Sequence, residues 1–200
     1  MIAWSLDACL GCKVVAGVVV AVPGGHEHGL DGLERVVTVD GGSTRAESVA
    51  NALAAVETEY VAIHDAARPL LTPELLSDLV SVLADAPDAA GVIAAAPITD
   101  TVKKVRPILG AHSAHKVRRV IGETLDRSEL WAAQTPQVFR TVALRAALQV
   151  DETDRDSATD EAMLIEAAGG TVLLHDPGAP NIKVTTALDL RVAELLLTER

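Results

Sequence analysis

The stretch YVAIHDAARPLLTPE, residues 60–74, contains the unit from which the fold is built. Its apolar start at Tyr60–Ile63 predicts a buried strand, and Thr72-Pro73 is typical of a helix N-cap followed by proline at the first helical position. A strand that leads through a short loop into a helix is the repeating unit of α/β proteins. The apolar run stops at His64-Asp65, and Arg68 follows, so charged side chains stand where the strand ends.

The same alternation of strands and helices extends in both directions along the chain. We predict helices over 3–12, 45–56, 73–85, 140–149, 158–168 and from 187 onward, and strands over 14–22, 35–39, 59–64, 91–96 and 171–175. This order is typical of one α/β domain with a Rossmann-like, mainly parallel sheet and helices on both faces. Ligands of such sheets bind beyond the carboxyl ends of the strands, so we expect Asp65 at the functional edge.

The composition supports this fold class and excludes several functions. Hydrophobic residues make up 49% of the chain but aromatic residues only 2%, so the core must consist of Ala, Val and Leu, which suits helices packed on a parallel sheet. The net charge of −11 argues against general nucleic-acid binding, although a local basic pocket is compatible with a nucleotide substrate. We find no membrane-spanning stretch and no signal peptide, and therefore expect no membrane partner and a cytoplasmic protein.

Residues 101–127 interrupt the alternation and are strongly basic. They hold seven of the 17 Lys and Arg residues, namely Lys103, Lys104, Arg106, Lys116, Arg118, Arg119 and Arg127. Pro107 and Gly110 offer a turn, so we predict a protruding hairpin. Two interpretations remain open: a solvated basic edge that protects a strand, or a dimer arm that supplies anion-binding residues to a neighbouring subunit.

Two small clusters could bind a metal but are better explained without one. Cys9 and Cys12 form a lone C-x-x-C within a predicted helix, and no second pair completes a zinc site. His26 and His28 lie in a glycine-rich loop without a third ligand. We interpret the first pair as ordinary helix cysteines and the second as solvated loop residues.

Three positions could carry chemistry on their residue types alone. Asp65 could bind Mg²⁺, act as a base, or pair with Arg68 and cap the loop. Gly41-Gly42 precedes a helix start, where backbone amides can meet a base, a ribose or a phosphate, but such a pair is also typical of a simple turn. Lys183 lies in the β-prone run NIKVT, residues 181–185, where its side chain would point away from those of its apolar neighbours.

Six motifs occur in an order that is typical of one family. They are VDGGSTRAESV at 39–49, VAIHDAARP at 61–69, APITDTVK at 96–103, LDRSELWAAQTPQVF at 125–139, SATDEAMLIEAAGG at 157–170 and NIKVTTALDL at 181–190. From about residue 34 to 197, the chain resembles 2-C-methyl-D-erythritol 4-phosphate cytidylyltransferases of the non-mevalonate isoprenoid pathway. Ribitol-5-phosphate cytidylyltransferase is the alternative, but Ala66-Ala67 favours the erythritol enzyme.

The resemblance implies a reaction and a role for each matching residue. CTP and 2-C-methyl-D-erythritol 4-phosphate would give 4-diphosphocytidyl-2-C-methyl-D-erythritol and pyrophosphate, with Mg²⁺ as cofactor. Asp65 would bind the Mg²⁺ on the triphosphate, and Arg68 would brace its loop. The other implied residues are Gly42, Ser43 and Ser48 at the cytosine and ribose, Arg127 and Lys183 as catalytic residues at the sugar phosphate, and Ala66, Thr101, Thr135 and Thr159 at the substrate.

The resemblance also implies a homodimer, and the sequence departs from the family at one place. The arm would cross to the partner subunit, so that Thr101, Arg127 and Thr159 would serve the partner's site. The family begins with a strand, a glycine-rich loop carrying an arginine, and a Pro-Lys pair, none of which matches this sequence. We therefore expect a chain that is truncated at its N-terminus relative to the family, with a sheet that lacks an interior strand. The alternative is that the chain is an inactive dimerising remnant.

Overall fold

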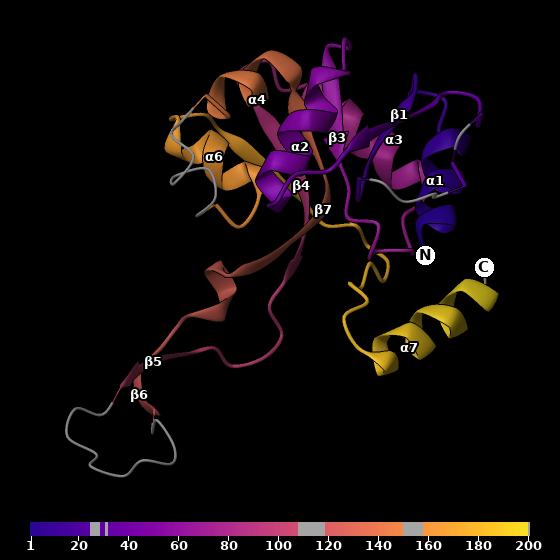
Figure 1. Cartoon of the computed structure of the whole chain (residues 1–200). Coiled ribbons are helices and arrows are strands. Elements are labelled where there is room, and N and C mark those ends of the chain that lie inside the picture. The colour runs from indigo at the N-terminus through magenta and orange to yellow at the C-terminus, as the bar shows by residue number, and fades with distance from the viewer. Residues whose placement is uncertain (25–28, 31, 108–118, 150–157, 200) are drawn as a thin grey trace.

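The computed structural model describes residues 1–24, 29–30, 32–107, 119–149 and 158–199. Its elements, drawn in Figure 1, are α1 (Ile2–Gly11), β1 (Val18–Val22), β2 (Val36–Asp40), α2 (Arg45–Ala54), β3 (Tyr60–Ile63), α3 (Pro73–Ala84), β4 (Gly91–Pro97), β5 (Lys103–Pro107), β6 (Arg119–Thr124), the 3₁₀ turn η1 (Arg127–Glu129), β7 (Trp131–Arg140), α4 (Thr141–Ala147), α6 (Glu161–Ala167), β8 (Val172–His175) and α7 (Ala187–Thr198). The predicted loop histidines, His26 and His28, and two basic arm residues, Lys116 and Arg118, lie outside the described residues.

The main sheet has the strand order β3-β7-β4-β8. Strand β4 pairs with β8 in parallel, while β7 runs antiparallel to both β3 and β4. Three of these strands therefore run in one direction and β7 runs in the other, which confirms the predicted α/β class with a mainly parallel sheet.

Strand β7 was not predicted, and Pro136 in its middle explains why. Proline has no N–H to donate to a sheet ladder and is usually confined to strand edges or irregularities. Here β4 accommodates it, because the β4–β7 register shifts between Ile93 and Ala95. The buried half of β7, including Val138 and Phe139, then fills the centre of the sheet.

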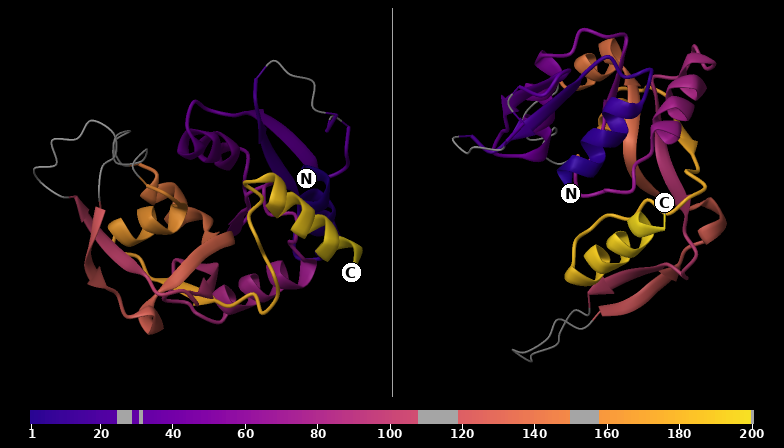
Figure 2. Two further views of the ribbon diagram at one scale, coloured as in Figure 1. Left: turned by 90° about the horizontal axis from the view of Figure 1, so that it is seen from below. Right: turned by 90° about the vertical axis from the view of Figure 1, so that its right-hand side faces the viewer.

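Helices cover both faces of the main sheet because its strands alternate between two apolar clusters. In β4, Val92 and Ala94 pack with Leu76 and Leu79 of α3, whereas Ile93 points to the opposite side. That opposite cluster contains Phe139 of β7 together with residues of α2, α4 and α6. The views in Figures 1 and 2 show α3 and α6 on opposite sides of the sheet.

Side-chain caps set the helix starts next to the functional edge. Thr72 accepts a hydrogen bond from the Leu75 amide at 3.2 Å, and Thr44 accepts one from the Glu47 amide at 3.1 Å. Each threonine satisfies an amide that the first turn of its helix leaves without a partner. These caps confirm the helix starts that were predicted from sequence.

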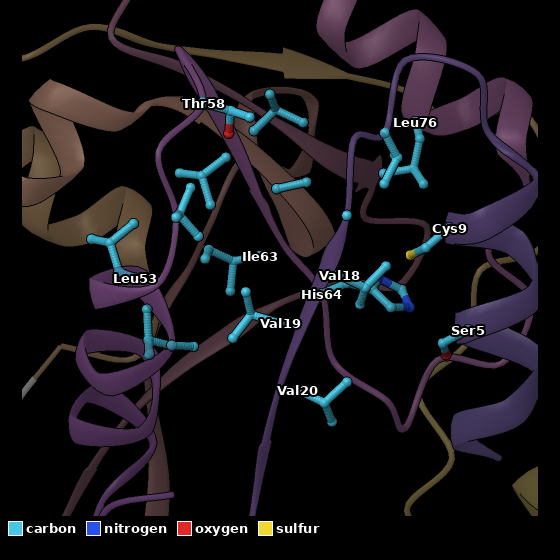
Figure 3. A pocket seen from close by; sticks show the side chains of 18 of the residues that line it. Ser5, Cys9, Val18, Val19, Val20, Leu53, Thr58, Ile63, His64 and Leu76 are labelled. Carbon is cyan, nitrogen blue, oxygen red and sulfur yellow. The ribbon is translucent and has the colours of Figure 1, made fainter. Parts of the chain in front are cut away.

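Strands β1 and β2 form a second, parallel sheet. Within the described residues no strand lies between β1 and β3, so each of these two strands pairs on one side only. A cavity of about 510 Å³ separates them, lined by 18–21 of β1, 60–63 of β3 and side chains of α1 and α2 (Figure 3). The fold therefore contains a largely apolar space between two strand edges.

The hairpin predicted near 101–127 is present. Strands β5 and β6 pair antiparallel, and Figures 1 and 2 show them projecting well away from the sheets. Val105 and Ile121 on this hairpin are 52% and 61% exposed, so their apolar side chains have no cover within the described chain. Whether the hairpin is a solvated edge or a dimer arm stays a prediction.

Candidate functional site

The site forms around Asp65, which lies just past the carboxyl end of β3. Its Oδ2 accepts a hydrogen bond from Lys183 Nζ at 2.7 Å, and its Oδ1 lies 3.5 Å from Arg45 Nη2. The fold thus joins Asp65 to a lysine 118 residues away in the chain. Two of the residues singled out from sequence, Asp65 and Lys183, are therefore in direct contact.

The surroundings keep Asp65 ionised. Burial by itself raises the pKa of this carboxyl, but the hydrogen bond from Lys183 and the charge of Arg45 outweigh burial, so the pKa lies below its usual value. The side chain is 18% exposed. An ionised carboxylate with partial access to solvent is suited to binding a cation or a positively charged group.

A chain of hydrogen bonds through Thr135 and His64 holds the backbone of Asp65. The Asp65 amide donates to Thr135 Oγ1 at 3.0 Å, and Thr135 Oγ1 lies 3.2 Å from His64 Nδ1. His64 Nε2 lies 3.1 Å from the carbonyl oxygen of Arg68, which can only accept, so Nε2 carries the proton and Nδ1 accepts from the threonine hydroxyl. Burial lowers the pKa of His64 to about 4 and keeps the ring neutral.

Thr135 was predicted to contact the substrate, but the structure engages its hydroxyl elsewhere. The residue is 5% exposed, and its oxygen already accepts one hydrogen bond and donates another. The geometry therefore favours Thr135 as a support for Asp65. Sequence analysis did not identify His64 as a site residue; its place at the end of the buried strand was the available signal.

Arg68 braces the loop after Asp65, as the resemblance implied. Its amide donates to the Asp65 carbonyl at 2.9 Å, and its Nη1 donates to the Asn181 carbonyl at 2.6 Å. The Val184 amide donates to the Ala67 carbonyl at 2.8 Å. These bonds tie the Asp65 loop to residues 181–184, which carry Lys183.

The predicted β-prone run at 181–185 is not a strand. It is an irregular segment that lies along the Asp65 loop, although Ile182 and Val184 are half-buried and Lys183 is exposed. The expected alternation of side chains is therefore present without a sheet ladder. The segment is held by its contacts with Arg68 and Ala67, which local sequence cannot reveal.

Arg45 and Glu161 complete the site, and sequence analysis did not identify either. Arg45 Nη1 and Nη2 donate to the two carboxylate oxygens of Glu161 at 2.6 and 2.9 Å. The Glu161 side chain is 2% exposed, so its carboxylate is removed from water, whereas the Arg45 side chain is 39% exposed. Only tertiary packing reveals this contact because the two residues are 116 positions apart.

The predicted nucleotide loop folds back onto the start of α2. The Gly42 amide donates to Ser48 Oγ at 3.0 Å, and the Ser43 amide donates to Glu47 Oε2 at 2.7 Å. A Cβ at Gly42 would lie 2.3 Å from Cγ of Glu47, so no other residue fits this turn without movement. These bonds are typical of a structured turn, and the predicted contacts with a nucleotide stay a prediction.

One cavity connects several of these residues. The space between β1 and β3 is also lined by Arg45, Ser48, His64, Asp65 and Ala66. In Figure 3, His64 lies in this cavity with Val18, Val19 and Ile63. Residues predicted for the nucleotide, the metal and the substrate thus share a single cavity.

Three predicted site residues lie elsewhere in this chain. Arg127 is exposed in η1 and donates to the Thr99 carbonyl, and Thr101 is exposed between β4 and β5. Thr159 is exposed immediately before Asp160, the N-cap of α6. Among the described residues, no hydrogen bond or ion pair connects these three to Asp65 or Lys183. Their predicted service to a partner's site stays a prediction.

Cys9 lies within α1 as predicted, whereas Cys12 is the C-cap residue that follows the helix. Cys9 and Cys12 are free thiols, and Cys12 Sγ lies 3.3 Å from Ser77 Oγ. Burial, and to a smaller extent the charge of the nearby Cys12, raises the pKa of Cys9 to about 11. A raised pKa disfavours the reactive thiolate. The described part of the chain contains no group of three or more His, Cys, Asp or Glu side chains able to hold a metal ion.

The described helices are also too short or too polar to cross a bilayer. None of them combines the length and the apolar character that a membrane span needs.

Comparisons with known proteins point to one family. The family described as 2-C-methyl-D-erythritol 4-phosphate cytidylyltransferase matches residues 1–199. Relatives of that name from a Synechococcus species and from Bordetella petrii are 40% and 41% identical; the matches cover 100% and 97% of this chain and 86% and 84% of the relatives. The crystal structure of the enzyme of that name from Thermus thermophilus is similar with a TM-score of 0.78 at 31% identity, over 96% of this chain and 86% of that one.

Proposed function

Because the chain belongs to the 2-C-methyl-D-erythritol 4-phosphate cytidylyltransferase family, we infer that it transfers a cytidylyl group from CTP to 2-C-methyl-D-erythritol 4-phosphate. A phosphate oxygen of the sugar phosphate attacks the α-phosphorus of CTP. The bond from that phosphorus to the β-phosphate bridging oxygen breaks, and pyrophosphate leaves with the electron pair. The observation that supports this function is the contact of Lys183 with Asp65, which lines a cavity together with Arg45 and Ser48 of α2.

We propose Mg²⁺ as the cofactor, and the residues at the site are suited to binding it. Mg²⁺ is commonly bound through one or two carboxylates together with substrate phosphates, so no cluster of acids is required. Asp65 offers an ionised and partly exposed carboxylate at the edge of the cavity. When bound, the metal would neutralise and orient the triphosphate.

Lys183 is proposed to bind the phosphate of the sugar substrate. Its ammonium contacts Asp65, and its side chain is 46% exposed. A lysine with a flexible stem can leave a carboxylate for an incoming phosphate without movement of the backbone. Lys183 would thereby place the attacking oxygen in line with the α-phosphorus, and such placement is the main part of phosphoryl-transfer catalysis.

The arm is proposed to complete the site across a homodimer. Arg127, Thr101 and Thr159 have exposed side chains that this chain does not bring to Asp65. The projecting hairpin offers a route by which one subunit could present Arg127 and Thr101 to another (Figure 2). Gly42, Ser43, Ser48 and Ala66 are proposed to contact the nucleotide and substrate from within the same subunit. A cytoplasmic location is also part of the proposal.

The experiment is a pyrophosphate-release assay with CTP, the methylerythritol phosphate and Mg²⁺. Asp65→Asn and Lys183→Ala are each expected to lower kcat/KM by at least about 100-fold. Asp65→Asn removes the carboxylate proposed to hold Mg²⁺, and Lys183→Ala removes the cation proposed to hold the sugar phosphate. Ribitol 5-phosphate serves as the control substrate and should give no more than background. Turnover of ribitol 5-phosphate in place of the erythritol substrate, or full activity of Asp65→Asn, would contradict the proposal. Sedimentation of the protein tests the dimer.

A further inference from the structure

Arg45 occupies a position where local chemistry disfavours a cation. It is the first residue of α2, and the N-terminus of a helix carries partial positive charge from its unpaired amides. An acid is preferred there, as Glu47 in the same turn illustrates. A residue that breaks a local rule is expected to have a tertiary or functional reason.

Glu161 is the tertiary half of that reason. It is the first residue of α6, where the helix N-terminus favours an acid, and its carboxylate is almost fully buried. Among the described residues, Arg45 supplies both hydrogen bonds to that carboxylate, through a planar fork that fixes its direction. Glu161 therefore holds the guanidinium of Arg45 in one place.

The same guanidinium reaches Asp65. Arg45 Nη2, which bonds Glu161 Oε2, also lies 3.5 Å from Asp65 Oδ1. Lys183 contacts the other oxygen of Asp65, but it ends a flexible chain and is the more exposed of the two cations. Asp65 is thus held by one anchored cation and by one cation that is free to move to a phosphate.

We propose that Arg45 is a positioning residue, anchored by Glu161, that keeps the Asp65 carboxylate in its orientation at the cavity throughout the reaction. This inference rests on the proposed function of Asp65. The Arg45–Glu161 pair connects the starts of α2 and α6 to the end of β3, so it links three elements at one point. Its contribution to catalysis is the direction of the Asp65 carboxylate, beyond any contribution to folding.

Paired substitutions separate positioning from folding. Arg45→Met leaves the buried Glu161 carboxylate without its partner and is expected to destabilise the protein, whereas Glu161→Met leaves Arg45 paired with Asp65 alone. The double variant Arg45→Met/Glu161→Met removes both charges, and apolar residues often replace buried ion pairs without loss of stability. Its melting temperature should return to near the wild-type value, while kcat stays about 100-fold below wild type, because small misplacements of reacting groups cost that much. Wild-type kcat in the stable double variant would overturn the proposal.

Arg45→Lys tests the same idea while keeping the positive charge. The Arg45 side chain is 39% exposed, and lysine keeps the charge but lacks the fork that bonds both Glu161 oxygens. We expect kcat and CTP affinity, measured by calorimetry with Mg²⁺, each to fall about tenfold, with an unchanged KM for the sugar phosphate. If both quantities stay at the wild-type level, charge alone suffices and the positioning role is wrong.

Two further variants complete the design. Arg191→Met removes an exposed arginine of α7 and should leave kcat and CTP affinity unchanged. Asp65→Asn separates the two proposals: if it keeps wild-type kcat, the function proposed for Asp65 fails. If Asp65→Asn loses activity but Arg45→Met/Glu161→Met keeps it, only the positioning inference fails.

Discussion

Because the fold holds His64 as a neutral ring, the protein is expected to lose stability as the pH falls below about 6.5. The neutral ring accepts from Thr135 at Nδ1 and donates to the Arg68 carbonyl at Nε2. A second proton would occupy Nδ1, which removes the acceptor that Thr135 uses and places a charge in a buried site. The hydrogen-bond chain that supports Asp65 would then be broken.

The size of the effect follows from the pKa. Burial lowers the pKa of His64 from 6.5 to about 4, so between these values the unfolded chain binds the proton and the folded chain does not. Stability therefore falls as the pH falls from 6.5 toward 4. At about 1.4 kcal/mol per pKa unit, the folded state loses roughly 3 kcal/mol by pH 4.

Urea unfolding of wild type and His64→Gln at a series of pH values isolates this effect. Glutamine does not titrate, so other acids contribute to both curves and largely cancel in the difference. The wild-type advantage in unfolding free energy should shrink by about 3 kcal/mol between pH 7 and pH 4. If the two proteins lose stability in parallel, His64 does not titrate as described and the hydrogen-bond assignment is refuted.

Other predictions concern the loop, the sheet edges and Thr135. Thr135→Val should cost about 1–3 kcal/mol in urea unfolding, because it leaves the Asp65 amide and His64 Nδ1 without partners; an unchanged midpoint would contradict the hydrogen-bond chain. Gly42→Ala should weaken CTP binding measured by calorimetry, because the added Cβ would lie 2.3 Å from Cγ of Glu47 and force the loop to move. Gly41→Ala is the control and should weaken binding less, because the atom nearest to its Cβ would be 3.3 Å away. Amides on the free edges of β1 and β3 should exchange with deuterium faster than those of β4, which is paired on both sides. Equal protection of the three strands would mean that the edges at the cavity are covered, against the strand order described above.

Local sequence was sufficient for the elements whose signals are short in range. The caps at Thr44 and Thr72 need only residues three positions away, and both helices begin where those caps predict. Strands β3 and β4 were likewise predicted because apolar runs bounded by polar residues identify them. Strand β7 was missed, because the local signal of Pro136 opposes a strand and the compensating register shift belongs to its neighbour β4.

The motifs in the sequence predicted the family and the fold class correctly, because these depend on residue type and order along the chain. The roles of Asp65 and Lys183 stay predictions. The fold alone established how these residues meet. Lys183 reaches Asp65 from 118 positions away, and Arg45 reaches Glu161 from 116 positions away. Such contacts depend on how helices pack on the sheet, and packing is a property of the whole chain that no local pattern encodes. For the same reason, the place of Asp65 at the end of a strand could be predicted from its motif, while its contact with Arg45 could not.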